Sequence, residues 1–308
     1  MIHHVYANQS NVGDWLSARG IQSLLAPFPV IEHFCDEPFV PETLRRLSSA
    51  PEDDFIIIGG GGLFMEYFAP FWEGFRTIAE RVPFCLWGVG YCDLKHGSSR
   101  ADAGLLAGIV QRSRLCIVRD ALTHAHLRQC PLPAPVPCPA LNAVPAANGA
   151  TSRLLHVDHF SVVGGEVYEF MCRTAEKFAK ETGRSYRQTN NLIPAGNADA
   201  LGKKLALYAS SDLVLTSRLH GCILALAMGR RVLAVSGDHK VESFMRAAGL
   251  GEWVCDLADI ASLPERLGAL PAQPVPREFV EAARRANVAV AAQIRSLLAQ
   301  TQTALTGS

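Results

Sequence analysis

Short apolar runs without alternation, separated by amphipathic segments, are the feature that most constrains the fold of this chain. "FIIIGGGG" (55–62), "PFCLWGVG" (83–90) and "DLVLT" (212–216) are typical of strands with both faces buried, and helical patterns lie between them. Strands of this kind form parallel sheets that helices cover on both faces. The pattern therefore predicts an α/β fold.

A proline-dense stretch at residues 130–150 interrupts this alternation of strands and helices. Proline cannot continue a helix or a central strand, so the stretch is either one irregular loop or a boundary between domains. Its length favours the boundary. We therefore predict an α/β lobe over 1–135, a second α/β lobe over 150–275, and a helix over 276–308 that packs back on the body. Ligands would bind in the cleft between the lobes, at the carboxyl ends of the strands.

Composition narrows the class of protein. Lys+Arg and Asp+Glu number 29 each, which argues against a protein that wraps nucleic acid. The nine cysteines are scattered without a C-x-x-C pair, a pattern that predicts a reducing compartment and neither a disulfide framework nor a zinc site. The start of the sequence shows no signal-peptide pattern and no apolar run is long enough to span a membrane, so we expect a cytoplasmic protein.

A run of four glycines, Gly59–Gly62, follows the apolar strand at "FIII". Glycines expose backbone N–H groups and allow a ligand or a helix to approach closely. The spacing matches neither a P-loop nor a dinucleotide-binding motif. A tight turn would explain one or two glycines but not four, so we predict a loop of the active site that includes Gly60, Gly61 and Gly62.

Two further strand ends carry polar residues. Asn11 and Asp14 lie in the first strand-to-helix connection; Asp14 is interpreted first as a helix cap, and alternatively as a carboxylate that orients a sugar hydroxyl. Arg119 and Asp120 end another apolar strand. They form either a ligand-facing pair or an internal ion pair in which Asp120 caps the next helix, and the sequence leaves both interpretations open.

The segment "SRLHG" joins a buried strand to a helix that is apolar on all sides. Ser217, Arg218 and His220 are expected at the first turn of that helix, whose unpaired N–H groups and dipole favour an anion. Alternatively, Arg218 forms a structural ion pair and His220 is a core histidine. That arrangement would place a cation and an imidazole at the positive end of a helix, and an anionic ligand would relieve this electrostatic conflict. Gly221 would let a ligand approach, and Lys240, after the next strand, would be a third cation.

These motifs occur together in one known family. "NVGD", "GGGGLF", "GVG", "VRD", "SRLHG" and a lysine twenty residues after the histidine recur in this order. From Asn11 to Lys240 the chain resembles the polysaccharide pyruvyl transferase family. The resemblance implies a GT-B-like fold with two Rossmann-like lobes, and transfer of pyruvate from phosphoenolpyruvate to two hydroxyls of a sugar as a cyclic ketal. Such a reaction belongs to polysaccharide biosynthesis, including that of exopolysaccharides.

The resemblance also implies roles for individual residues. Arg119 corresponds to the family's donor-binding arginine, His220 to the histidine near phosphoenolpyruvate, and Lys240 to its companion lysine, while Arg218 takes the motif's arginine position. The chain departs from the family at Cys138, where members often carry an aspartate. It is also short between the lobes, and these differences bear on acceptor recognition.

A reaction scheme follows from these roles. Phosphoenolpyruvate carries a phosphate and a carboxylate, which Arg119, Arg218 and Lys240 would hold. His220, with a pKa in the usual range of histidine, would protonate the methylene carbon; a sugar hydroxyl would attack, and Asp14 or Asp120 would accept its proton. The scheme requires no metal and no cofactor.

The sequence is also compatible with two other functions. The same fold would suit a glycosyltransferase that uses a nucleotide sugar, or a non-catalytic ligand-binding relative. The acceptor would be a sugar or a lipid-linked glycan, and a lipid-linked acceptor would bring the protein to the inner membrane face. The sequence leaves the oligomeric state open.

Overall fold

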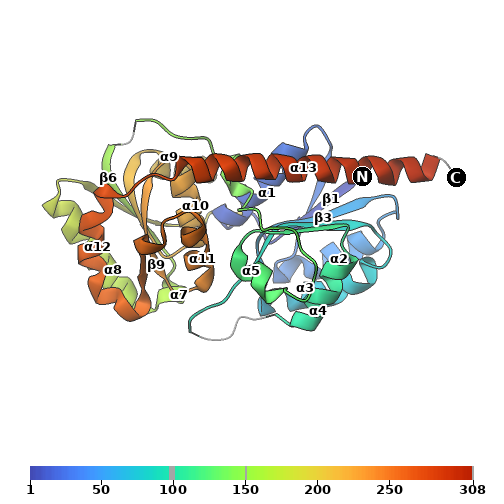
Figure 1. The fold of residues 1–308 in the computed structure, drawn as a ribbon, viewed down its shortest axis with the longest axis horizontal. Helices are drawn as coiled ribbons and strands as arrows, with labels where there is room; N and C mark the ends of the chain where they lie inside the picture. The colour runs from blue at the N-terminus through green and yellow to red at the C-terminus, as the bar shows by residue number, and fades with distance from the viewer. Residues whose placement is uncertain (97–100, 150, 307–308) are drawn as a thin grey trace.

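Two five-stranded parallel sheets lie side by side along the molecule in the computed structural model (Figure 1). The structure describes residues 1–96, 101–149 and 151–306. Residue 150, where the second lobe is predicted to start, and residues 307–308 of the predicted last helix lie outside the described residues. Helices cover both sheets, so the predicted α/β fold with two lobes is confirmed.

The first sheet has the strand order β2-β1-β3-β4-β5, and all its strands run parallel. Its elements are β1 (Ile2–Tyr6), α1 (Val12–Leu25), β2 (Val30–Phe34), η1 (Glu37–Phe39), α2 (Val40–Ser48), β3 (Phe55–Phe64), η2 (Glu66–Phe68), α3 (Ala69–Ile78), β4 (Phe84–Tyr91), α4 (Ala103–Arg112), β5 (Leu115–Val118) and α5 (Ala121–His126). A short helix, α6 (Ala140–Ala143), lies within the proline-dense stretch.

The second sheet has the order β10-β9-β8-β6-β7 and is also parallel. Its elements are β6 (Thr151–Asp158), α7 (Phe160–Val163), α8 (Gly165–Glu181), β7 (Ser185–Asn190), α9 (Ala198–Ala209), β8 (Ser211–Thr216), α10 (Leu219–Ala227), β9 (Arg231–Ser236), α11 (His239–Ala247), η3 (Gly251–Trp253), β10 (Val254–Asp256), η4 (Leu257–Ser262), α12 (Leu263–Ala269) and η5 (Leu270–Ala272). The last helix, α13 (Arg277–Thr306), follows.

The four glycines lie inside β3 and not in a loop, although Gly62 lines a cavity between the lobes as predicted for the active site. Gly59 pairs with Trp87 and Gly61 with Val89 of β4, although the register shifts beyond Gly61. Gly60 and Gly61 have φ values of +87° and +116°, which side chains rarely adopt. A Cβ on Gly60 would lie 2.9 Å from the Cβ of Ser17 in α1. Gly60 and Gly61 therefore make room for α1, whose Ser17 and Asp14 lie against them.

Strand β2 is an element that the sequence analysis did not foresee. Its sequence, "VIEHF", places a glutamate and a histidine after only two apolar residues. It pairs with β1 alone and forms an edge of the first sheet. An edge strand needs less apolar surface than a central one, so its signal is weaker.

Helix α13 runs along both lobes, as predicted (Figure 1). Val290 and Ile294 belong to the apolar cluster on one face of the first sheet, whereas Val280 belongs to the cluster around α10 in the second lobe. Between them, Asn287 accepts a hydrogen bond from Trp87 Nε1 at 3.0 Å. Its Nδ2 donates to the carbonyl oxygen of Pro137 at 2.9 Å. The helix therefore ties the two lobes and their connection together.

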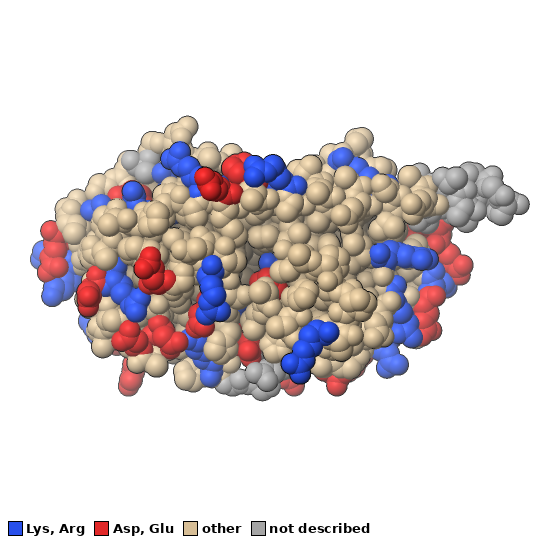
Figure 2. All heavy atoms as spheres, viewed as in Figure 1, with Lys and Arg blue, Asp and Glu red and all other residues tan. Residues whose placement is uncertain are grey.

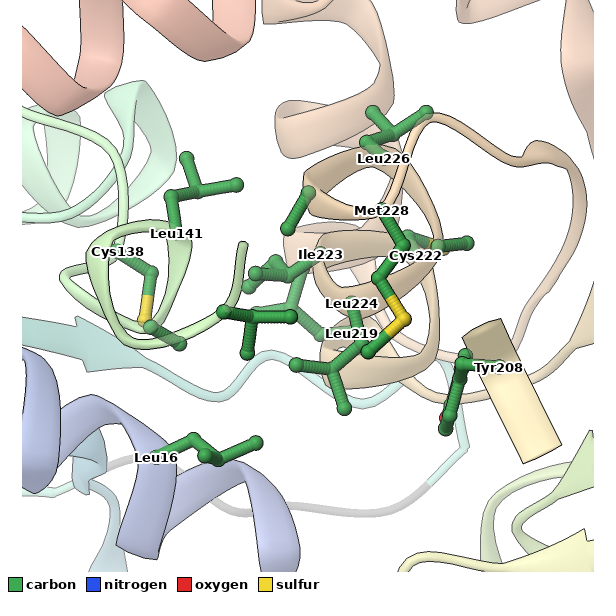
Figure 3. Packing of buried hydrophobic residues seen from close by; sticks show 14 of the residues in the cluster. Leu16, Cys138, Leu141, Tyr208, Leu219, Cys222, Ile223, Leu224, Leu226 and Met228 are labelled. Atoms are coloured by element: carbon green, nitrogen blue, oxygen red, sulfur yellow. The ribbon is translucent and has the colours of Figure 1, made fainter. Parts of the chain in front are cut away.

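An apolar cluster also fills the seam between the lobes. Figure 3 shows Leu16 of α1, Cys138 and Leu141 of the connecting segment, and Leu219 and Ile223 of α10 in this cluster. All nine residues of α10 are buried. The start of α10 is consequently held in a dry environment between the lobes.

The molecular surface carries both signs of charge. On the face drawn in Figure 2, acidic and basic side chains are interspersed rather than gathered by sign. No helix among the described residues has the length and apolar character needed to cross a bilayer.

The packing of α13 gives a stability prediction. Ile294 is 0% exposed, so Ile294→Ala should lower the free energy of unfolding by about 2–5 kcal/mol through the cavity it leaves. Val288 on the same helix is 53% exposed, so Val288→Ala should change the free energy of unfolding by less than about 0.5 kcal/mol. Urea unfolding followed by tryptophan fluorescence measures both. Equal effects would contradict the packing described here.

Candidate active site

A cavity of about 460 Å³ lies between the lobes, where the carboxyl ends of strands from both sheets meet. This is the position at which parallel α/β sheets bind their ligands. Its polar lining consists of Asn8, Asn11, Asp14, Asp36, Tyr67, Cys92, Arg119, His159, Ser161, Asn191, Ser217, Arg218, His220, Asp238 and Lys240.

Backbone hydrogen bonds join the lobes beside the cavity. Val12 N donates to the carbonyl oxygen of Asn191 at 2.9 Å. On another side, His239 N donates to the carbonyl oxygen of Asp93 at 3.0 Å, and Lys95 N to that of Gly237 at 3.0 Å. These contacts fix how the cationic residues of the two lobes face one another.

Arg119 directly follows β5 and is 4% exposed. Its Nε lies 3.3 Å from Asp120 Oδ2, whereas its buried Nη2 has no hydrogen-bond partner in the described part of the chain. An unpaired buried polar group costs about 1–3 kcal/mol, and more when charged. An anion in the cavity would supply the missing partner.

Asp120 has a different position. Its Oδ1 accepts hydrogen bonds from the backbone N and the Oγ1 of Thr123, both at 2.7 Å, and so caps α5. It does not line the cavity that the described residues form. The ion pair of Arg119 with Asp120 is thus confirmed, and Arg119 also lines the cavity. Because Arg119 and Thr123 engage both carboxylate oxygens of Asp120, this residue is not placed to accept a proton from a sugar hydroxyl.

The "SRLHG" segment enters the cavity at the start of α10. Arg218 takes the N-cap position and its Nε donates to the carbonyl oxygen of Asp158 at 2.5 Å. Ser217 Oγ accepts from His159 N at 2.8 Å. A Cβ on Gly221 would lie 2.1 Å from Thr216 Oγ1, so this glycine serves the packing of α10 on β8. The prediction that Gly221 admits a ligand is therefore wrong.

The ring of His220 packs against α1 of the other lobe. A Cβ on Gly13 would lie only 1.9 Å from His220 Nδ1, so a glycine is needed there. His220 Nε2 lies 3.3 Å from Ser17 Oγ and 3.8 Å from Cys138 Sγ. Ser17 Oγ and Cys138 Sγ are themselves 2.9 Å apart. This explains why "NVGD" and "SRLHG" occur in the same chain: they meet in space.

The surroundings of His220 disfavour its charged form. Burial, and then the charges of Arg119, Lys240 and Arg218, place the pKa of His220 well below its ordinary value of 6.5. The expectation of a pKa in the usual range is thus wrong for the protein alone. A bound anion would offset the three cations and raise this pKa.

Lys240 lies in the first turn of α11 with two partners. Its Nζ is 2.6 Å from Asp238 Oδ2 and 3.1 Å from Cys92 Sγ. Burial opposes the charge, but the interactions with Cys92 and Asp238 outweigh it and raise the pKa of Lys240. The lysine therefore reaches the cavity as a cation that already has a carboxylate beside it.

Asp14 is not the cap of α1, contrary to our first interpretation. Asn11 is the cap, because its Oδ1 accepts from Gly13 N at 2.9 Å. Asp14 instead lines the cavity, where burial raises the pKa of its carboxyl to about 6 despite the nearby Arg119 and Lys240. A carboxyl with this pKa can exchange a proton near neutral pH.

The first lobe contributes a polar and aromatic edge that the sequence analysis missed. Tyr67 is 46% exposed and its hydroxyl donates to Asp36 Oδ1 at 2.6 Å. Asn8 Nδ2 donates to Asp36 Oδ2 at 3.1 Å. Asn8 and Asp36 each follow the carboxyl end of a strand, β1 and β2, and this position could have identified them as residues of the site. Asp36 was missed because the sequence analysis did not predict β2.

The structure thus separates the predicted site residues into two groups. Those that line the cavity are Asn11, Asp14, Gly62, Arg119, Ser217, Arg218, His220 and Lys240. Those placed elsewhere among the described residues are Gly60, Gly61, Asp120 and Gly221. No group of three or more His, Cys, Asp or Glu side chains in the described segments could hold a metal ion.

Comparison with known proteins adds a family and a fold. The family model for polysaccharide pyruvyl transferase matches residues 11–239. No curated protein sequence matches the chain at a significant level.

Among solved structures, the S. aureus MnaA–UDP structure matches with a TM-score of 0.59 and 9% identity, over 91% of this chain and 90% of that chain. A Neisseria meningitidis UDP-GlcNAc 2-epimerase bound to UDP-GlcNAc matches with a TM-score of 0.59 and 11% identity, over 95% of this chain and 99% of that chain. The calicheamicin glycosyltransferase CalG4 matches with a TM-score of 0.53 and 17% identity, over 97% of this chain and 98% of that chain. At these identities the likeness concerns the GT-B fold alone.

The contact between Gly13 and His220 can be tested by substitution. In Gly13→Ala the added methyl group would overlap the imidazole ring, so the free energy of unfolding should fall by about 1–3 kcal/mol. Gly202→Ala in α9 is the matched control, because among the described residues no heavy atom beyond its chain neighbours and the surrounding helix backbone lies within 4 Å of its Cβ position. The control should be neutral or stabilising by up to about 1 kcal/mol. Chemical denaturation compares them, and equal losses would refute the contact.

The charge state of His220 gives a pH prediction. Below pH 6.5 the unfolded histidine binds a proton that the folded protein excludes, so this group lowers stability as the pH falls. Inorganic phosphate should raise the pKa of His220, as measured by NMR titration of the ring. His156, whose pKa burial lowers to about 4 outside the cavity, is the control and should not respond. A phosphate-independent His220 would contradict the anion site.

Proposed function

The chain belongs to the polysaccharide pyruvyl transferase family, and from this premise we propose that it transfers the pyruvyl group of phosphoenolpyruvate to two hydroxyls of a sugar. The product is a cyclic ketal on a glycan or a glycan precursor. The observation that carries the proposal is the convergence of Arg119, Arg218 and Lys240 with His220 on one cavity. A small molecule with both a phosphate and a carboxylate suits such a set of cations.

The donor is bound by groups that are already oriented. Nη2 of Arg119, without a partner in the described part of the chain, points to an anionic oxygen as its acceptor. Arg218 stands at the N-terminus of α10, where backbone N–H groups and the helix dipole also favour anions. Lys240 adds a charge whose position Asp238 fixes. Groups held in this way need little rearrangement on binding.

His220 supplies the proton that starts the reaction. The charge of the bound donor raises the pKa of the imidazole, so the histidine becomes an acid only when phosphoenolpyruvate is present. Transfer of its proton to the methylene carbon leaves a cationic centre at C2, which one sugar hydroxyl attacks. The C2–O bond to phosphate then breaks, phosphate leaves, and the second hydroxyl closes the ring. Asp14, with a pKa of about 6, accepts the proton of the first hydroxyl and then releases it to solvent. The imidazole of His220, neutral after its proton transfer, takes up the proton of the second hydroxyl.

The acceptor sugar enters along the edge formed by Asn8, Asp36 and Tyr67. Carboxylate and amide oxygens bind hydroxyl groups, and the half-exposed ring of Tyr67 offers an apolar face for a sugar ring. The scattered cysteines favour a reducing compartment, so the proposed reaction takes place in the cytoplasm. A lipid-linked acceptor would hold it at the inner membrane face.

A direct assay tests the function. The protein is incubated with phosphoenolpyruvate and a panel of free, nucleotide-linked and lipid-linked sugars. We expect phosphate release that depends on the acceptor, together with the mass of one pyruvyl ketal on the sugar. Turnover only with nucleotide sugars would instead indicate a glycosyltransferase, and binding of phosphoenolpyruvate without release a non-catalytic protein.

In the same assay, His220→Asn should lower kcat by about 10²–10⁴-fold, the range that general acid catalysis contributes. His239→Asn is the control, because the side chain of His239 is 47% exposed and does not line the cavity that the described residues form. It should stay within about twofold of the unchanged protein. Circular dichroism checks that both variants fold. An unaffected kcat in His220→Asn would remove the histidine from the mechanism.

A further inference from the structure

Cys92 differs from the other buried cysteines in its surroundings. Burial raises the pKa of the thiols of Cys35, Cys85, Cys116 and Cys222, which makes them poor nucleophiles. Cys92 follows the end of β4 and lines the cavity instead. Lys240 Nζ donates a hydrogen bond to its Sγ at 3.1 Å. The ammonium group of Lys240 therefore places a positive charge directly beside the sulfur, where it attracts anions.

A second cation borders the same space. Gly62 lies between Cys92 and Arg119: a Cβ there would be 2.6 Å from Cys92 Sγ and 3.5 Å from Arg119 Nη2. Cys92 Sγ occupies the space that a side chain at Gly62 would take and lies 3.8 Å from the carbonyl oxygen of Gly62. Gly62, Cys92 and Arg119 all line the cavity. Arg119 Nη2 is buried and has no hydrogen-bond partner in the described part of the chain. A small anion held by this nitrogen would therefore lie next to the sulfur.

We propose that Cys92 is a modification site for small anionic electrophiles, which Arg119 and Lys240 guide onto its sulfur. The reagent class carries a carboxylate or a phosphate next to an electrophilic carbon. An unreactive anion held by the same two cations shields the thiol. This inference rests on the geometry of the cavity and does not require the proposed transferase reaction.

The modification is a simple displacement with a haloacetate. The Cys92 thiolate attacks the methylene carbon of iodoacetate, the new C–S bond forms as the C–I bond breaks, and iodide leaves. The thiol proton passes to solvent. The carboxylate of the product then occupies the position between Arg119 and Lys240. Iodoacetamide reacts in the same way but carries no charge, so a comparison of the two reagents isolates the electrostatic contribution.

The experiment compares two cysteines in the full-length protein by peptide mass spectrometry. Cys172 is partly exposed on α8 and outside the cavity, so it reports the intrinsic ratio of iodoacetate to iodoacetamide rates. We expect this ratio to be about tenfold higher at Cys92, within the range that focused electrostatic fields give. Inorganic phosphate at constant ionic strength should slow the labelling of Cys92 and leave that of Cys172 unchanged.

A pair of lysine variants completes the test. Lys240→Met should bring the Cys92 ratio down to that of Cys172, whereas Lys177→Met, at a side chain 76% exposed, should leave it unchanged. The phosphate measurement needs no variant and decides the matter if Lys240→Met does not fold. Equal ratios at the two cysteines, no labelling of Cys92, or equal phosphate effects on both would each overturn the proposal.

Discussion

The contact of His220 with Gly13 is the interaction on which the site depends. It joins the first turn of α10 in the second lobe to the first turn of α1 in the first lobe, and the missing side chain at Gly13 is what lets the ring enter. The apolar cluster around Leu16 and Ile223 keeps water out of this seam. Histidine is held neutral there because three cations and burial act in the same direction. The ring therefore responds to whatever negative charge the cavity receives.

Charge in the cavity is arranged rather than simply accumulated. Arg119 and Lys240 each have a carboxylate beside them, Asp120 and Asp238, which fixes the cations without a ligand. Two groups stay available to a ligand among the described residues, and both have a defined direction. They are Nη2 of Arg119, which has no hydrogen-bond partner there, and the N-terminus of α10. Selectivity for an anion would then come from oriented donors more than from net charge, in keeping with a chain that has equal numbers of acidic and basic residues.

Much of this architecture could be predicted from the sequence, because unalternating strands specify parallel sheets and their carboxyl ends bring distant motifs together. Sequence reasoning failed where it had to name the partner of a glycine. Gly60 and Gly221 do allow a close approach, but α1 and Thr216 make it, not a ligand. The cap of α1 was mispredicted in a similar way, since Asn11 and Asp14 are both suited to the role and only the backbone geometry chooses between them. The cap of α5 by Asp120 is confirmed. The edge strand β2 lacked a continuous apolar run. The limits of the lobes and the roles of the site residues stay predictions.

Helix α13 has a mechanical consequence. This one continuous helix packs on both lobes. The side-chain amide of Asn287 hydrogen-bonds both to the connecting segment and to Trp87 of β4 in the first sheet. Sliding the two lobes apart would separate α13 from one of them. A relative movement of the lobes that keeps both attachments of α13 is a rotation about an axis near Asn287, and it would strain the backbone hydrogen bonds of Val12 and His239 that join the lobes.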